Sequence, residues 1–132
     1  MMRWAGGLLL ALAACKSGSG GTWNDVFGVP WKLTHMKGRA TVPGTTVTLT
    51  LGENQRATGR AVNNYTVRYT RSGSGLKLGK IGATKKFLDS PPGAMAQESN
   101  YFYLLGQVST WRIKNKKLEL LREGKPVLTF AR

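Results

Sequence analysis

The side chains that could do covalent chemistry are few in this 132-residue chain, and their spacing matches no catalytic motif. One Cys and one His are too few for a thiolate or imidazole metal site. The sequence has neither a Gly-Xaa-Ser-Xaa-Gly motif nor a phosphate-binding Gly-Lys-Ser/Thr loop. No two of the acids have a spacing typical of acid–base catalysis: Asp25, Glu53, Asp89, Glu98, Glu119 and Glu123. We therefore expect no enzymatic activity, no cofactor and no metal site.

Basic side chains are the more informative group, because 20 Lys and Arg face only 6 Asp and Glu, for a net charge of +14. Such a surface attracts polyanions. Several cations alternate with apolar residues on predicted strands or lie in the turn that follows: Arg68, Lys77, Lys80, Arg112, Lys114, Lys116 and Lys117. Neighbouring strands could merge them into one patch that binds anionic lipid, lipopolysaccharide or another envelope polymer. The alternative is a solvated surface that keeps the protein soluble.

Three aromatic residues offer a competing interpretation, a platform on which single-stranded nucleic acid would stack. Tyr65, Tyr69 and Trp111 occupy the apolar phase of their strands, which favours packing in the core. Export of the protein, predicted next, also argues against this partner. We expect no nucleic-acid binding.

The N-terminus has the pattern of a targeting segment. Arg3 precedes an apolar run over residues 5–14, which is too short to span a bilayer as a helix. The tetrapeptide ending at Cys15, Leu-Ala-Ala-Cys, resembles the bacterial lipobox, in which a signal peptidase cuts before the Cys and the Cys is lipidated. The resemblance predicts a signal peptide over residues 1–14 and acyl chains on Cys15 that attach the protein to a membrane.

The residues after Cys15 indicate where the domain would work. Lys16, rather than the Asp that retains lipoproteins in the inner membrane of enterobacteria, predicts an outer-membrane location facing the periplasm. Residues 15–28 are rich in Gly, Ser and Lys near their start and predict a flexible tether. A folded domain over residues 29–132 follows.

Short alternating runs dominate that domain. Strands are expected at residues 31–36, 45–51, 56–62, 65–70, 76–81, 111–114, 117–121 and 126–131. One helix is expected over residues 93–106, where apolar residues follow a period near 3.6, with Ser90 as its cap. The fold class is therefore mainly β (α+β): a single antiparallel sheet or partly closed barrel of about six to eight strands with one helix.

An ordered series of landmarks resembles the META domain family, which includes the heat-shock-locus J lipoproteins of bacteria. Residues 31–33 resemble its opening Trp-Xaa-Leu strand, and Gly59 with residues 62–65 resembles its Gly-Cys-Asn-Xaa-Tyr stretch. Residues 76–85, 95–105, 118–120 and 128–130 are similar to its later strands and helix. The resemblance implies a small, mainly β fold, a role in the envelope linked in some relatives to heat or antibiotic stress, and no catalytic residues.

Two departures from the family pattern lead to a structural expectation. Val62 and Leu88 stand where some members have cysteines, so we expect this pair to be buried and adjacent, replacing a disulfide by packing. Functionally, we expect a lipid-anchored, non-enzymatic envelope protein. The alternative is an inhibitor or ligand-binding barrel lipoprotein, for example a lysozyme inhibitor. The net charge argues against the latter example, because lysozymes are themselves usually basic.

Overall fold

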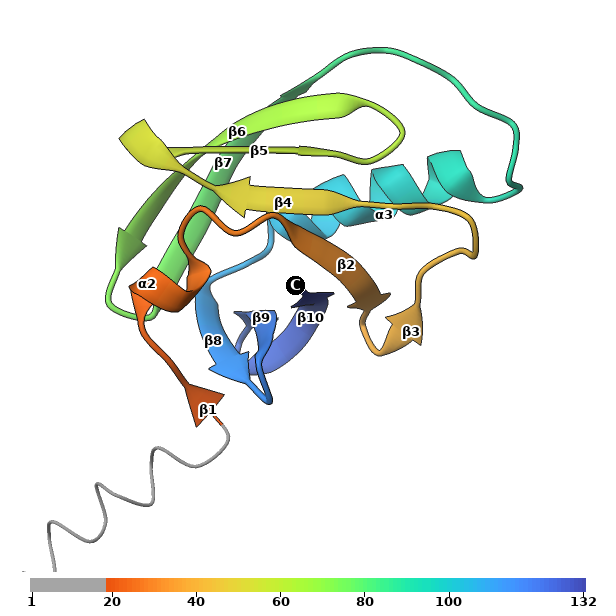
Figure 1. Ribbon diagram of the computed structural model, residues 1–132. Coiled ribbons are helices and arrows are strands. Elements are labelled where there is room, and N and C mark those ends of the chain that lie inside the picture. The colour runs from red at the N-terminus through yellow and green to blue at the C-terminus, as the bar shows by residue number, and fades with distance from the viewer. Residues whose placement is uncertain (1–18) are drawn as a thin grey trace, which may run out of the picture.

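A computed structural model describes residues 19–132, and Figure 1 shows their arrangement. The predicted signal peptide and Cys15 lie outside the described residues. The elements, in chain order, are β1 (Ser19–Gly20), α2 (Trp23–Val26), β2 (Trp31–Met36), β3 (Arg39–Ala40), β4 (Thr48–Leu51), the 3₁₀ segment η1 (Glu53–Gln55), β5 (Arg56–Arg60), β6 (Asn64–Ser72), β7 (Gly75–Ala83), α3 (Ala94–Leu105), β8 (Thr110–Lys114), β9 (Lys117–Arg122) and β10 (Lys125–Ala131).

The strands form one antiparallel sheet that curls into a ring. Their order is β8-β7-β6-β5-β4-β2-β10-β9, and pairing of β8 with β9 closes the ring. The closure is thin on one side, since β7 and β8 share only the pair Gly75 and Thr110. Beyond that pair β1 takes over the free edge of β8, which protects it from pairing with another chain. The predicted fold class, an antiparallel sheet or partly closed barrel with one helix, is confirmed.

Alternation of apolar and polar residues builds the core inside this ring. In β4 Leu49 and Leu51 are buried while the intervening threonines face outward, and in β6 every second residue from Tyr65 to Tyr69 is buried. The largest fully buried side chains are Trp31, Tyr101, Phe130, Leu49, Leu51, Leu76, Leu105, Leu118, Leu120 and Leu128. The ring therefore encloses a packed interior.

Helix α3 lies with β4–β7 on one side and with β2 and β3 on the other (Figure 1). Its inner face buries Tyr101, Leu104 and Leu105. The predicted helix over residues 93–106 is confirmed, but the predicted cap is wrong. The helix is entered through Gly93, whose φ of 90° lies in the left-handed region that glycine adopts at no steric cost, and Ser90 lies outside it.

Residues 19–28 belong to the fold, so the predicted tether is wrong over this part of its length. Helix α2 buries Val26 completely, and the Trp31 indole N–H donates to the Val26 carbonyl at 3.1 Å. The helix begins with a capping interaction in which the Thr22 backbone N–H donates to Asp25 at 2.9 Å. That hydrogen bond also lowers the pKa of the Asp25 carboxyl. The four-residue helix α2 therefore packs against the ring.

Candidate functional site

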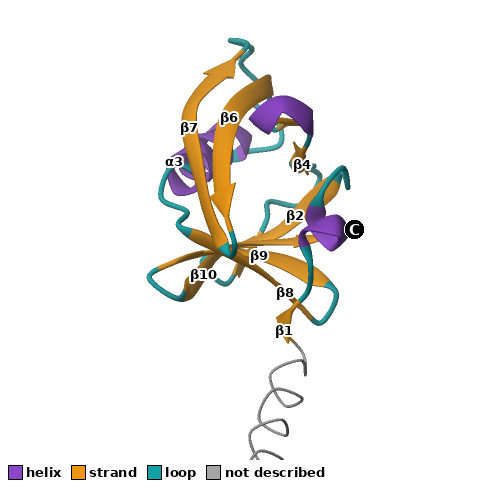
Figure 2. Ribbon diagram, turned by 90° about the vertical axis from the view of Figure 1, so that its left-hand side faces the viewer, coloured by secondary structure: helices purple, strands orange, loops and turns teal. Residues whose placement is uncertain are grey.

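The predicted basic patch is divided in two by the ring. β7 and β8 run antiparallel and diverge from their one shared pair, so Lys80 lies five residues to one side of it and Lys114 four residues to the other. At about 3.3 Å per residue the two lie up to roughly 30 Å apart. Figure 2 shows β6 and β7 rising away from β8 and β9. The expectation that all seven cations merge into one patch is therefore wrong.

The first cluster, which we call the hairpin group, consists of Lys114, Lys116 and Lys117 at the tip of the β8–β9 hairpin. Lys114 and Lys117 are directly opposite in register, and all three lysines are exposed. Asn115 and Lys116 have φ values of 53° and 64°, as the tight two-residue turn of a hairpin requires. On the strand side, Arg112 forms an ion pair with Glu119 at 2.6 Å. Arg112 is thus paired with an acid, whereas the lysines of the hairpin group form no ion pair within residues 19–132.

The described chain enters the sheet directly beside the hairpin group. Ser19 pairs with Lys114, and Gly20 pairs with Ile113. The described part of the chain therefore begins, at Ser19, beside this lysine-rich tip. No sequence pattern predicted this pairing, because two residues are too few to show an alternation.

The second cluster, which we call the strand group, consists of Arg68, Lys77 and Lys80 on the outer face of β6 and β7. Arg56 on β5 lies directly opposite Arg68 in register and adds a fourth cation that the sequence analysis missed. Like charges opposite one another on neighbouring strands destabilise a sheet modestly. The signal was present in the sequence, since Arg56 precedes Ala57 in the polar phase of its strand.

The three aromatic residues are core residues, as predicted, and do not form a stacking platform. Tyr65, Tyr69 and Trp111 are 2%, 6% and 7% exposed. Their polar atoms bond to backbone carbonyls: the Tyr69 hydroxyl donates to Gly52 at 2.6 Å, and the Trp111 indole N–H donates to Gly73 at 3.0 Å. These contacts join separate strands of the ring.

A buried polar network lies beneath helix α3 at the turn between β5 and β6. Glu98, only 7% exposed, accepts the Asn63 backbone N–H at 2.7 Å and the Asn63 side-chain amide at 3.0 Å. The Asn63 side-chain oxygen in turn accepts the Thr84 hydroxyl at 2.8 Å and the Lys86 N–H. Glu98 therefore ties the helix to the turn and, through Asn63, to the exit of β7. The side chain of Glu98 therefore has a structural role.

Val62 and Leu88 are not buried as a pair. Both line a pocket of about 420 Å³ on the β4–β5 side of α3. Leu88 is 42% exposed and Val62 is only half-buried, so the expectation of a buried packed pair is wrong. The Asn63–Glu98 network, rather than this pair, holds the turn against the helix.

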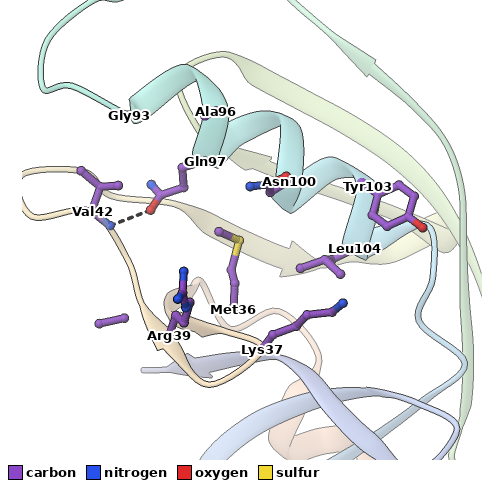
Figure 3. A pocket seen from close by; sticks show the side chains of 11 residues that line it. Met36, Lys37, Arg39, Val42, Gly93, Ala96, Gln97, Asn100, Tyr103 and Leu104 are labelled. Atoms are coloured by element: carbon purple, nitrogen blue, oxygen red, sulfur yellow. Dashed lines mark hydrogen bonds between the residues drawn. The ribbon is translucent and has the colours of Figure 1, made fainter.

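A second pocket, of about 490 Å³, lies on the opposite side of α3, between the helix and the β2–β3 hairpin (Figure 3). We call it the helix pocket. Its volume falls within the range of small-molecule sites, about 300–1,000 Å³. It is lined by Met36, Lys37, Arg39, Ala40, Val42, Gly93, Ala96, Gln97, Asn100, Tyr103 and Leu104. Two of these are cations and none is a carboxylate.

Residues 19–132 contain no cluster of three or more His, Cys, Asp or Glu side chains that could hold a metal ion. None of the helices in this range is long and apolar enough to cross a bilayer.

A closed antiparallel ring with a single long helix, two pockets beside that helix and two separate basic clusters make up a small, mainly β domain. A family model for the META domain matches residues 24–132, and the chain belongs to the META domain family. The match begins within α2, in agreement with the packing of that helix against the ring. No functionally curated protein matches the chain.

Two solved structures have the same fold. An NMR structure of a protein from Burkholderia xenovorans gives a TM-score of 0.64 at 22% identity, covering 81% of this chain and 83% of that one. A second NMR structure of a protein gives a TM-score of 0.66 at 15% identity, covering 84% of this chain and 94% of the other. At these identities the likeness establishes the fold alone.

Proposed function

We propose that this META domain protein is a non-enzymatic, lipid-anchored component of the bacterial envelope whose hairpin group lies against an anionic membrane surface. The pairing of Ser19 with Lys114 is the observation on which this rests. It places the start of the described chain beside the hairpin group, so that a lipidated Cys15, four residues earlier, would be near these lysines. The predicted lipobox supplies the anchor, and the hairpin group supplies the electrostatic contact.

The length of the connection supports this orientation. Cys15 precedes Ser19 by four residues, and a fully extended chain covers at most about 3.6 Å per residue, or roughly 14 Å here. Acyl chains on Cys15 would hold the hairpin group within this reach of the headgroups. A basic side chain near an anionic membrane contributes about 1 kcal/mol of binding free energy. The tether raises the effective concentration of the domain at the surface, which amplifies even a weak attraction.

The proposed location is the outer membrane facing the periplasm, because Lys16 replaces the Asp that signals inner-membrane retention. The partners would be anionic lipid, lipopolysaccharide or another envelope polymer. The strand group would then lie beyond the Gly75–Thr110 pair, on the side away from the hairpin group. A role in envelope stress or antibiotic tolerance is carried by the family resemblance. The non-enzymatic assignment is supported by the absence of catalytic motifs in the sequence and by the structural engagement of Glu98.

Vesicle co-sedimentation tests the orientation. The experiment uses residues Lys16–Arg132, which include every described element. One solved structure has this fold over 94% of its chain. The triple variant K114Q/K116Q/K117Q removes the hairpin group, and the matched control R68Q/K77Q/K80Q removes the same charge from the strand group. At about 1 kcal/mol per residue, the hairpin variant should bind anionic vesicles about 100-fold more weakly, and the control much less so. Equal losses in both variants would contradict a specific orientation.

Lipidation is tested separately in cells. Cys15→Ser should leave an unprocessed precursor, whereas the parent chain is processed and extracted with membranes. Mature, membrane-extracted protein from the Cys15→Ser variant would refute the anchor while leaving the vesicle result intact.

The alternative function, an inhibitor or ligand-binding lipoprotein, is favoured by one observation, the helix pocket. Because lysozymes are usually basic, this basic domain would repel them. The ligand of such a lipoprotein would therefore not be a lysozyme.

A further inference from the structure

We propose that the helix pocket binds an amphipathic carboxylate, a medium-chain fatty acid in class, with its chain on the apolar floor and its carboxylate at the cationic rim that Lys37 and Arg39 form. The inference stands apart from the lipid anchor, because it rests only on residues that line this pocket. Figure 3 shows the site with helix α3 above and the β2–β3 hairpin below.

The two cations are held by a tight hairpin. Met36 pairs with Arg39, and Lys37 and Gly38 between them have φ values of 49° and 80°, which makes a two-residue turn. The Lys37 backbone N–H donates to the Val127 carbonyl at 2.9 Å, which fixes the turn to β10. The fixed backbone keeps both cations at the rim of the pocket, where their side chains lie on either side of Met36 (Figure 3).

The floor and one wall of the pocket are apolar and ordered. Met36 rises from β2 toward the helix, and Leu104 faces it from α3 (Figure 3). The wall formed by Val42 is held by Gln97, whose side-chain oxygen accepts the Val42 N–H at 2.7 Å. The Gln97 amide group also donates to the Thr45 hydroxyl at 2.8 Å, so this residue is already satisfied. An alkyl chain is therefore the chemistry that fits the floor.

The rim of the pocket carries polar side chains that could bind an anion. Among residues 19–132, the side chains of Lys37 and Arg39 form no ion pair. Asn100 also lies at the rim, on the helix side, where its amide can donate a hydrogen bond to a ligand. No carboxylate lines this pocket, whereas the pocket on the other side of α3 contains Glu98. Charge complementarity thus selects an anion for the helix pocket specifically.

Size and chemistry together narrow the ligand class. A compact inorganic anion would leave the apolar floor unused, and a neutral lipid would leave two cations without a partner. A single-chain carboxylate uses both, and a volume of about 490 Å³ accommodates a ligand of that size. Release of such chains from lipids by hydrolysis is the class of reaction that would supply it.

Titration of Lys16–Arg132 with decanoate, followed by NMR or calorimetry below the concentration at which decanoate self-associates, tests the proposal. Decanol provides the chain without the charge, and acetate provides the charge without the chain. We expect saturable binding of decanoate that is at least 10-fold tighter than that of either analogue. Equal affinity for decanol and decanoate, or absence of saturable binding, would overturn the proposal.

Variants locate the site. K37Q/R39Q should weaken decanoate binding at least 10-fold and leave decanol binding unchanged, and K77Q/K80Q, with equal charge loss on the strand group, should leave both unchanged. Ala96→Phe fills the pocket from an exposed helix position without changing charge and should abolish binding of both ligands. Equal decanoate affinity in K37Q/R39Q and the parent chain would show that the cations do not hold the carboxylate. Decanoate binding unchanged by Ala96→Phe would place the ligand elsewhere.

Discussion

The aromatic ring of Tyr65 lies directly over Gly59 of the neighbouring strand. A Cβ atom added at Gly59 would come within 2.5 Å of the Tyr65 hydroxyl oxygen and 2.0 Å of the Thr48 carbonyl oxygen. In the space left by the missing side chain, the Tyr65 hydroxyl reaches across β5 and donates to the Thr48 carbonyl of β4 at 2.6 Å. The same hydroxyl bonds to the hydroxyl of Tyr101 on α3. One glycine therefore allows one tyrosine to join three elements of the ring.

Gly59→Ala should destabilise the protein strongly for this reason. Overpacking a core typically costs about 1–3 kcal/mol, and the contact with the Thr48 backbone places this case at the upper end. Chemical denaturation measures the free energy of unfolding. Gly82→Ala is the control, since a Cβ there would meet only Thr66 at an ordinary 3.8 Å. A similar loss in both variants would show that strand propensity, and not the contact with Tyr65, sets the cost.

Asn63→Ala should show how much the buried polar network contributes to the free energy of unfolding. The substitution removes the side-chain amide that Glu98 accepts and leaves that carboxylate with the Asn63 backbone N–H alone. A buried polar group that loses its hydrogen-bond partner costs about 1–3 kcal/mol, and we expect a loss of free energy of unfolding in this range. Asn64→Ala, at the exposed neighbouring position, should change the free energy of unfolding by less than about 0.5 kcal/mol. Equal stability of the two variants would contradict the role given to Asn63.

The elements that could be predicted are those with a repeating pattern long enough to show a period. The alternation of Val47, Leu49 and Leu51 predicts β4, and the run after Met95 predicts α3. Helix α2 has only four residues, so it shows no period. Its capping signal, Thr22 followed three residues later by Asp25, was nevertheless present in the sequence.

The exposure of the basic side chains could be predicted from the sequence, but their arrangement on the molecule could not. Cations in the polar phase of a strand are exposed, as the alternation of Lys77 and Lys80 indicated. Whether two strands bring their cations together depends on the register of the strands and on how the ring closes. Both are set by contacts between residues that are distant in the sequence. β7 and β8 share only the pair Gly75 and Thr110 and diverge from it, which separates the two basic groups. Nothing in the sequence of either strand specifies that they meet at this one pair. The helix pocket likewise depends on a hairpin and a helix that are distant in the chain.

The packing of α2 predicts a contribution from a segment that resembled a tether. Val26→Ala removes two methyl groups from a fully buried site and should lower the free energy of unfolding by about 2 kcal/mol. Asn24→Ala, on the exposed side of the same four-residue helix, is the matched control and should have little effect. Thermal and chemical unfolding of both variants provide the measurement. If Val26→Ala unfolds like the parent chain, α2 does not contribute to the stability of the domain.

Burial of two hydrogen-bonded tyrosines predicts a loss of stability at alkaline pH. Desolvation raises the pKa of Tyr101 well above its usual range, and burial likewise raises the pKa of Tyr65. In the unfolded chain both phenols release their protons near pH 10, while the folded protein retains them. The unfolded state then binds fewer protons, so the free energy of unfolding falls with rising pH. Their contribution is intact below about pH 10. Above it, each tyrosine should lower the free energy of unfolding by up to about 1.4 kcal/mol per pH unit.

Comparison of the parent chain with Tyr65→Phe between pH 8 and pH 11.5 isolates this effect, because lysine titration is common to both proteins. The variant should be less stable at pH 8, where it lacks the hydrogen bond to the Thr48 carbonyl. Its stability should then fall less steeply above pH 10, so that the two curves converge as the pH rises. Parallel curves would show that Tyr65 releases its proton at the same pH in the folded and unfolded chains, against the burial of its hydroxyl between β4 and α3.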